Sequence, residues 1–106
     1  MTLYEQLTDS ETGIGLPCAY SHFTGADAPD APPYLVYLGA GQDTFAADNT
    51  YYLRRGKYTI EYYFTDKDEA QEAAIEDFLL AHGYLYEKSE DVYIEEQGVF
   101  VIYYSI

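Results

Sequence analysis

The stretch 51-YYLRRGKYTIEYY-63 decides the fold and also holds three of the five basic residues of the chain, Arg54, Arg55 and Lys57. Runs of β-forming residues at 50–54 and 57–65 flank the pair Arg55-Gly56. Because glycine adopts a positive φ readily, this pair predicts the tight turn of a β-hairpin. Aromatic and aliphatic residues alternate with polar ones from 57 to 64, so the second arm should turn one face to a core.

Upstream of this hairpin, the sequence predicts one short helix and two strands. Thr2 and Glu5 have the spacing of a capping box, which indicates a helix from Leu3 to about Thr8. The segments 18-CAYSHF-23 and 34-YLVYLGA-40 predict strands, and the second is apolar enough to be central in the sheet. The proline-rich residues 24–33 and residues 41–49 are predicted to be loops.

Downstream, a longer helix is predicted to begin at a capping box of Asp66 and Glu69 and to end at His82 and Gly83. Its expected apolar stripe consists of Ala70, Ala74, Ile75, Phe78, Leu79 and Ala81. Its expected polar face consists of Glu69, Glu72 and Glu76, and Leu80 lies off the stripe. Two further strands, 84–96 and 98–106, are predicted to meet near Gly98.

These elements predict a single domain, residues 1–106, of the α+β class. The expected order is α-β-β-β-β-α-β-β. Hairpins join most neighbouring strands, so the sheet should be largely antiparallel or mixed, with a long β-hairpin and two helices packed on one face.

The charge of the chain is strongly one-sided. Nineteen acidic residues against five basic ones give a net charge of −14, which makes specific nucleic-acid binding improbable because phosphates are gripped by Lys and Arg. Such a surface can repel DNA, mimic it, or meet a basic patch of a partner. Solubility alone is the alternative explanation. The fourteen tyrosines suit either half-exposed strand faces or subunit contacts.

Signs of catalysis are absent from the sequence. No phosphate-binding loop, metal-ligand spacing or nucleophile–base set stands out, so we expect no enzyme, no catalytic or metal site and no cofactor. Cys18 lies among apolar neighbours and is expected to act as a small hydrophobic residue. No apolar run is long enough to span a membrane, and we expect a protein that stays in the cytosol.

From Leu16 to Ile106, the string "LPCAYSHF…PPYLVYLGAG…FAADNTYY…YTIEYYFTDKDEAQEAAIEDFL…YEKSEDVYIEEQGVFVIYYSI" resembles small proteins encoded in the structural gene clusters of tailed phages and prophages. The resemblance lies in general sequence texture and not in a catalytic signature. It is to tail-terminator, tail-completion or head–tail joining proteins. It implies an α+β domain that forms a homo-oligomeric ring, commonly a hexamer, in the phage neck. The implied partners are the tail tube and the head–tail connector, and assembly would take place in the host cytoplasm.

A ring suggests a role for the basic hairpin. We expect Arg54, Arg55 and Lys57 to meet an acidic surface on the next subunit, and a solvated turn is the alternative. The expected acceptor surface consists of Glu87, Glu90, Asp91, Glu95 and Glu96, with Leu80 as a further interface residue. The acids expected to line the bore, where they would repel passing DNA, are Asp27, Asp30, Asp43 and Asp48. The alternative function is an acidic DNA mimic that inhibits a host nucleic-acid-binding enzyme.

Overall fold

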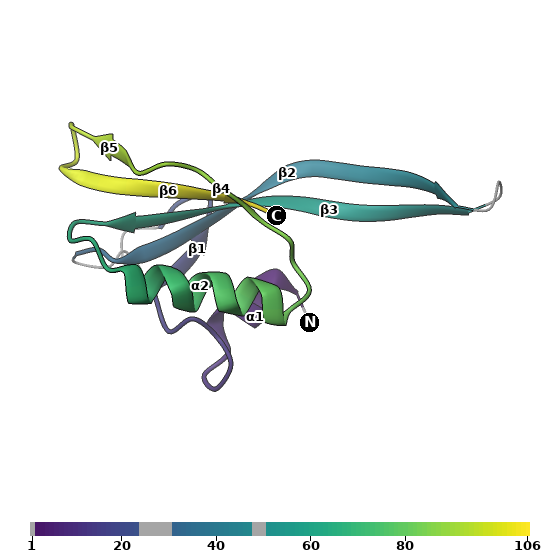
Figure 1. The fold of residues 1–106 in the computed structure, drawn as a ribbon, viewed down its shortest axis with the longest axis horizontal. Helices are drawn as coiled ribbons and strands as arrows, with labels where there is room; N and C mark the ends of the chain where they lie inside the picture. Colours follow the sequence, from purple (N-terminus) through teal and green to yellow (C-terminus); the bar gives the residue numbers. More distant parts are fainter. Residues whose placement is uncertain (1, 24–30, 48–50) are drawn as a thin grey trace.

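The computed structural model describes residues 2–23, 31–47 and 51–106, and for 41–47 and 51–56 it describes the backbone alone. Two helices and six strands follow one another in this part of the chain (Figure 1). They are α1 (Leu3–Thr8), β1 (Cys18–Tyr20), β2 (Tyr34–Ala47), β3 (Tyr51–Phe64), α2 (Glu69–Ala81), β4 (Glu87–Lys88), β5 (Val92–Ile94) and β6 (Val99–Ser105).

The six strands form one mixed, mostly antiparallel sheet. Its order is β1-β2-β3-β6-β4, and β5 also pairs with β6. Only β1 and β2 run parallel among the described pairs. Both helices lie on one face of the sheet, so the predicted α+β class is confirmed (Figure 1).

The six predicted strands and the six observed ones divide the chain differently. The predicted strands 50–54 and 57–65 are the single strand β3, and the predicted loop 41–49 belongs to β2 as far as Ala47. The β2–β3 register runs from Tyr34 opposite Tyr63 to Ala47 opposite Tyr51, with an irregularity between Gly39 and Gln42. Arg55-Gly56 is therefore not the turn of the hairpin. The predicted strand 84–96 is divided into β4 and β5.

Helix α1 is confirmed together with its cap. The Glu5 amide donates to the Thr2 hydroxyl at 3.2 Å, and the Glu5 carboxylate accepts from the Thr2 amide. In α2 the predicted cap is wrong by two residues, because Asp68 and not Asp66 accepts from the Gln71 amide at 3.1 Å. The helix ends at His82 as predicted, and the following Gly83 has a φ of +80°.

A core between the helices and the sheet holds the fold together. Fully or nearly fully buried side chains come from both helices and from three strands: Leu3, Leu7, Leu35, Ile60, Tyr62, Phe64, Ile75, Phe78, Leu79, Ile102 and Tyr104. The predicted stripe of α2 is correct for Ile75, Phe78 and Leu79, but its three alanines are exposed. Glu72, expected on the polar face, is buried in their place with 3% exposure.

The paired strands β2 and β3 extend well beyond this core (Figure 1). The molecule measures 50 × 28 × 28 Å, and its radius of gyration is 15.2 Å. A compact chain of about 100 residues has a radius of gyration near 13 Å. The excess reflects the projecting part of the hairpin.

Candidate interaction surfaces

The first candidate surface is this projection, which we call the arm and define as residues 41–47 of β2 and 51–56 of β3. The two strands pair continuously here, with Asp43 opposite Arg55 and Thr44 opposite Arg54. The basic residues predicted to tip the hairpin therefore lie along strand β3.

The arm pairs only with itself in the described part of the chain. β1 pairs with residues 35–37 of β2, and β6 pairs with residues 59–64 of β3, so both neighbours stop short of it. A two-stranded ribbon in water is marginally stable at best, since a third strand or a packed helix is needed to bury one of its faces. The arm is thus the segment that gains most from a partner.

The acids predicted to receive the hairpin gather at one edge of the sheet. Glu87 lies in β4, Glu90 and Asp91 follow it, and Glu95 and Glu96 are in the turn between β5 and β6. All five are exposed. This surface, the acidic edge, is irregular because the two short strands are separated by residues 89–91, where the Ser89 hydroxyl accepts from the Tyr103 amide at 2.9 Å.

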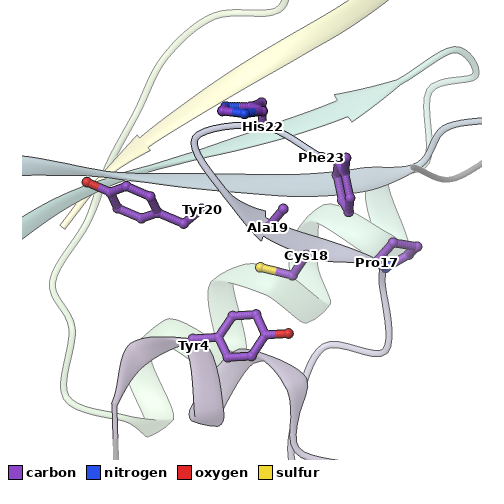
Figure 2. Close-up of a pocket in the computed structure, with 7 residues that line it drawn as sticks. All are labelled: Tyr4, Pro17, Cys18, Ala19, Tyr20, His22 and Phe23. Atoms are coloured by element: carbon purple, nitrogen blue, oxygen red, sulfur yellow. The ribbon is translucent and has the colours of Figure 1, made fainter. Parts of the chain in front are cut away.

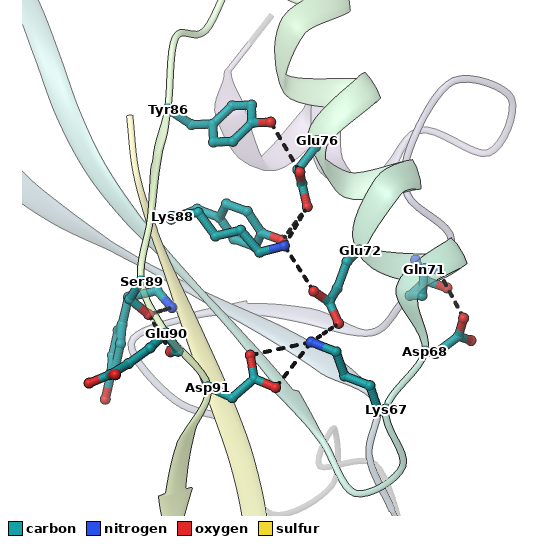
Figure 3. A network of polar contacts seen from close by, with 12 residues as sticks. Lys67, Asp68, Gln71, Glu72, Glu76, Tyr86, Lys88, Ser89, Glu90 and Asp91 are labelled. Carbon is teal, nitrogen blue, oxygen red and sulfur yellow. Dashed lines mark hydrogen bonds and ion pairs between the residues drawn. The ribbon is translucent and has the colours of Figure 1, made fainter.

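One of these acids is already engaged within the chain. Lys67 lies 3.0 Å from Asp91 and 2.8 Å from Glu72, which joins the acidic edge to helix α2 (Figure 3). Lys88 from β4 completes the cluster at 2.9 Å from Glu72 and 3.0 Å from Glu76. Two of the five basic residues of the chain therefore hold together the part of the molecule outside the arm, which we call the body.

This cluster explains how a carboxylate can be buried in the core face of α2. Burial raises the pKa of Glu72, but the hydrogen bonds from Lys67 and Lys88 outweigh it, so the pKa falls below its usual 4.5. For Glu76, burial is likewise outweighed by the hydrogen bonds from Lys88, Tyr104 and Tyr86, and its pKa is lowered as well. The burial of Glu72 could have been predicted from its spacing, because it lies three residues before Ile75 and seven before Leu79 and therefore on the same face of the helix.

The third candidate surface is formed by β1, at the edge of the sheet opposite the acidic edge. A pocket of about 450 Å³ borders this strand, and its lining residues are Tyr4, Pro17, Cys18, Ala19, Tyr20, His22 and Phe23 (Figure 2). Tyr4 and Tyr20 are 46% and 57% exposed, which is high for such large side chains. Burial raises the pKa of the Cys18 thiol to about 11, so it is a packing residue at neutral pH.

The other residues singled out from the sequence are scattered. Leu80 is exposed on α2, as expected for a residue off the stripe. Asp43, expected in a loop, lies in strand β2. Asp27, Asp30 and Asp48 lie outside the described residues, so their predicted place in a bore has no structural counterpart here.

Among the described residues, no group of three or more His, Cys, Asp or Glu side chains is placed to bind a metal ion. The described helices include none with the length and apolar character that crossing a bilayer requires. Comparison of the chain with protein-family models, with curated proteins and with solved structures gave no significant match.

Proposed function

We propose that this protein is a structural virion protein of a tailed phage or prophage. It forms a homo-oligomeric ring, with six copies as the expected number, at the head–tail junction. There it caps the tail tube and joins the tail to the capsid through the connector proteins. The resemblance of residues 16–106 to phage neck proteins suggests this role.

The observation that carries the proposal is the arm. A ring requires a heterologous contact, in which one surface of a subunit meets a different surface of the next copy and the rotation closes. The arm is an extended β-ribbon that reaches away from the core, and no described strand covers its outer edges. Such a projection suits a contact between neighbouring copies better than it suits a free monomer.

The acidity of the chain fits a ring through which DNA passes. A bore lined by carboxylates repels phosphates, and the duplex then slides without binding. Asp27, Asp30, Asp43 and Asp48 remain our proposed lining. In the sequence, Asp27 and Asp30 lie between β1 and β2, and Asp48 lies between β2 and β3, whereas Asp43 lies in the arm.

The alternative is a DNA mimic that occupies the nucleic-acid site of a host enzyme. The observation that favours it is the acidic edge, where five exposed carboxylates lie within ten residues. A mimic would act as a monomer or dimer and would need no arm.

Native mass spectrometry combined with negative-stain electron microscopy tests the two functions directly. The ring proposal predicts a closed oligomer with a central hole. Deletion of the gene from its phage or prophage should then give capsids and tails that fail to join, or tails of uncontrolled length. A monomer that binds a DNA-processing enzyme would favour the mimic, and normal virions from the deletion strain would refute the neck role.

A further inference from the structure

We propose that the outer edge of β1, which no described strand covers, is the docking site for the arm of a second copy, which adds to the sheet as a further strand. This inference rests on the proposed ring and names the receiving surface. Three features of the molecule carry it: the hydrogen-bonding direction of β1, the contrast between the two edges of the sheet, and the distribution of charge.

The hydrogen-bonding direction of β1 leaves groups available on its outer side. The Leu35 amide donates to the Pro17 carbonyl at 2.8 Å, and the Ser21 amide donates to the Tyr37 carbonyl at 2.9 Å. The backbone groups of residues 17, 19 and 21 therefore point to β2, and because successive residues of a strand alternate, those of Cys18 and the Tyr20 amide point to the outer edge. The Tyr20 carbonyl on that side already accepts from the His22 amide at 2.7 Å. An added strand would pair with the remaining groups, which is the usual mode of β-augmentation.

The two edges of the sheet differ in how they are protected against such pairing. The acidic edge is broken by residues 89–91 and carries five exposed charges, and both features normally prevent edge-to-edge association. The β1 edge carries no charge, since its strand is Cys18-Ala19-Tyr20. Beside it lies the aromatic pocket with the exposed rings of Tyr4 and Tyr20 (Figure 2). The β1 edge is therefore the one suited to receive a strand.

The charge distribution identifies the occupant as the arm of another copy. Two subunits of net charge −14 repel each other, so their contact must be made by the least acidic segment. The arm contains Asp43 against Arg54 and Arg55, which is a net charge of +1. The whole negative charge thus lies outside the arm. Residues 2–23, which include β1, carry three acids and no Lys or Arg.

Disulfide trapping between differently labelled copies tests this contact. All variants carry Cys18→Ala, so that each copy has a single cysteine. One copy has Tyr20→Cys in β1. The other has Gln42→Cys, Thr44→Cys or Ala46→Cys in the arm, a series that samples the register. Paired strands hold Cα atoms within the range that a disulfide spans. Matched controls replace Tyr20→Cys by Glu95→Cys at the acidic edge or by Leu80→Cys on α2.

We expect oxidation to give covalent dimers between position 20 and at least one arm position, and none with positions 95 or 80. If rings form but the arm is trapped at position 95, the inference is wrong while the ring proposal stands. If the protein is monomeric at every concentration, both are wrong.

A second measurement separates backbone pairing from contacts of the Tyr20 ring. Tyr20→Ala removes the ring and keeps the amide, whereas Tyr20→Pro also removes the outward N–H, which an edge strand tolerates. We expect Tyr20→Pro to weaken self-association by up to about tenfold more than Tyr20→Ala, the effect of losing one backbone hydrogen bond. Equal self-association of the two variants, with both still folded, would overturn strand addition.

Discussion

The body and the arm share strands β2 and β3, yet these strands have different surroundings in the two regions. In the body, β3 is paired on both sides, and its inward side chains Ile60, Tyr62 and Phe64 are buried under the helices. In the arm, the same strand is paired on one side alone in the described chain. One half of β3 is therefore part of the core, and the other half is the part that we propose as a contact element.

The largest expected effect comes from removing core volume within β3. Ile60→Ala should lower the free energy of unfolding by about 2–5 kcal/mol, because the side chain is fully buried and its loss leaves a cavity. Leu53→Ala, in the arm part of the same strand, should cost less than about 1 kcal/mol in the monomer. Urea denaturation of both variants measures the difference. Equal losses of the free energy of unfolding would show that Leu53 in the arm contributes as much to the stability of the monomer as Ile60 in the body.

The next effect concerns the cluster that ties α2 to the sheet. Lys88→Met should cost about 1–3 kcal/mol, because a nearly buried Glu72 loses one of its two partners. In a Glu72→Gln background the same change should cost less, since the two side chains act as a pair. A double-mutant cycle measured by denaturation gives this coupling energy, and a value near zero would contradict the role assigned to Lys88.

The same cluster should make the stability of the body depend on pH. The pKa of Glu72 is lower in the folded protein than its usual 4.5, so its stabilisation is fully present above that value. It is lost as the pH falls through the lower, folded pKa. The stability difference between the natural protein and Glu72→Gln should therefore be constant near neutral pH and shrink below about pH 4. Chemical denaturation at a series of pH values follows it, and a difference that grows on acidification would refute the assignment.

A smaller effect distinguishes the two possible caps of α2. Asp68→Ala should cost about 1 kcal/mol, because it removes the acceptor of the Gln71 amide. Asp66→Ala, the matched control at the position that the sequence favoured, should change the free energy of unfolding by less than about 0.5 kcal/mol. Thermal melts of the two variants compare their losses of stability. A larger loss for Asp66→Ala would show that Asp66 caps the helix, as the sequence predicted.

These cases show where sequence reasoning succeeded and why it stopped. Periodicity and capping residues located α1, the end of α2 and the inward face of the second half of β3, because these depend on neighbours within a few residues. The cap of α2 was misplaced because Asp66, Asp68, Glu69 and Gln71 offer overlapping cap spacings, and only the tertiary path of the chain selects one.

The candidate surfaces were harder to predict for a related reason. Glu72 was predicted to face solvent, because its partners Lys67 and Lys88 lie outside the helix and do not contribute to the helix pattern. Likewise Gly56 suggested a turn, although the strand continues past it. Edge position is a property of strand order, which no local pattern around Cys18–Tyr20 encodes.

The smallest effect on folding, and the sharpest contrast between body and arm, is expected from Arg54→Glu combined with Arg55→Glu. Each change lowers the charge by two, so the net charge goes from −14 to −18. The Glu at position 55 then lies opposite Asp43, and a like-charge pair across two strands costs at most about 1 kcal/mol, confined to the arm. The melting of the body should stay close to that of the natural protein. Self-association should fall steeply, because the net charge of the arm changes from +1 to −3 and the arm is then as acidic as the surface that it approaches. Added salt should restore part of it by screening. Arg54→Ala with Arg55→Ala, at a net charge of −16, should weaken self-association to an intermediate degree. Sedimentation velocity at low and high salt ranks the three proteins, and identical profiles for all of them would show that the basic residues of the arm serve solubility alone.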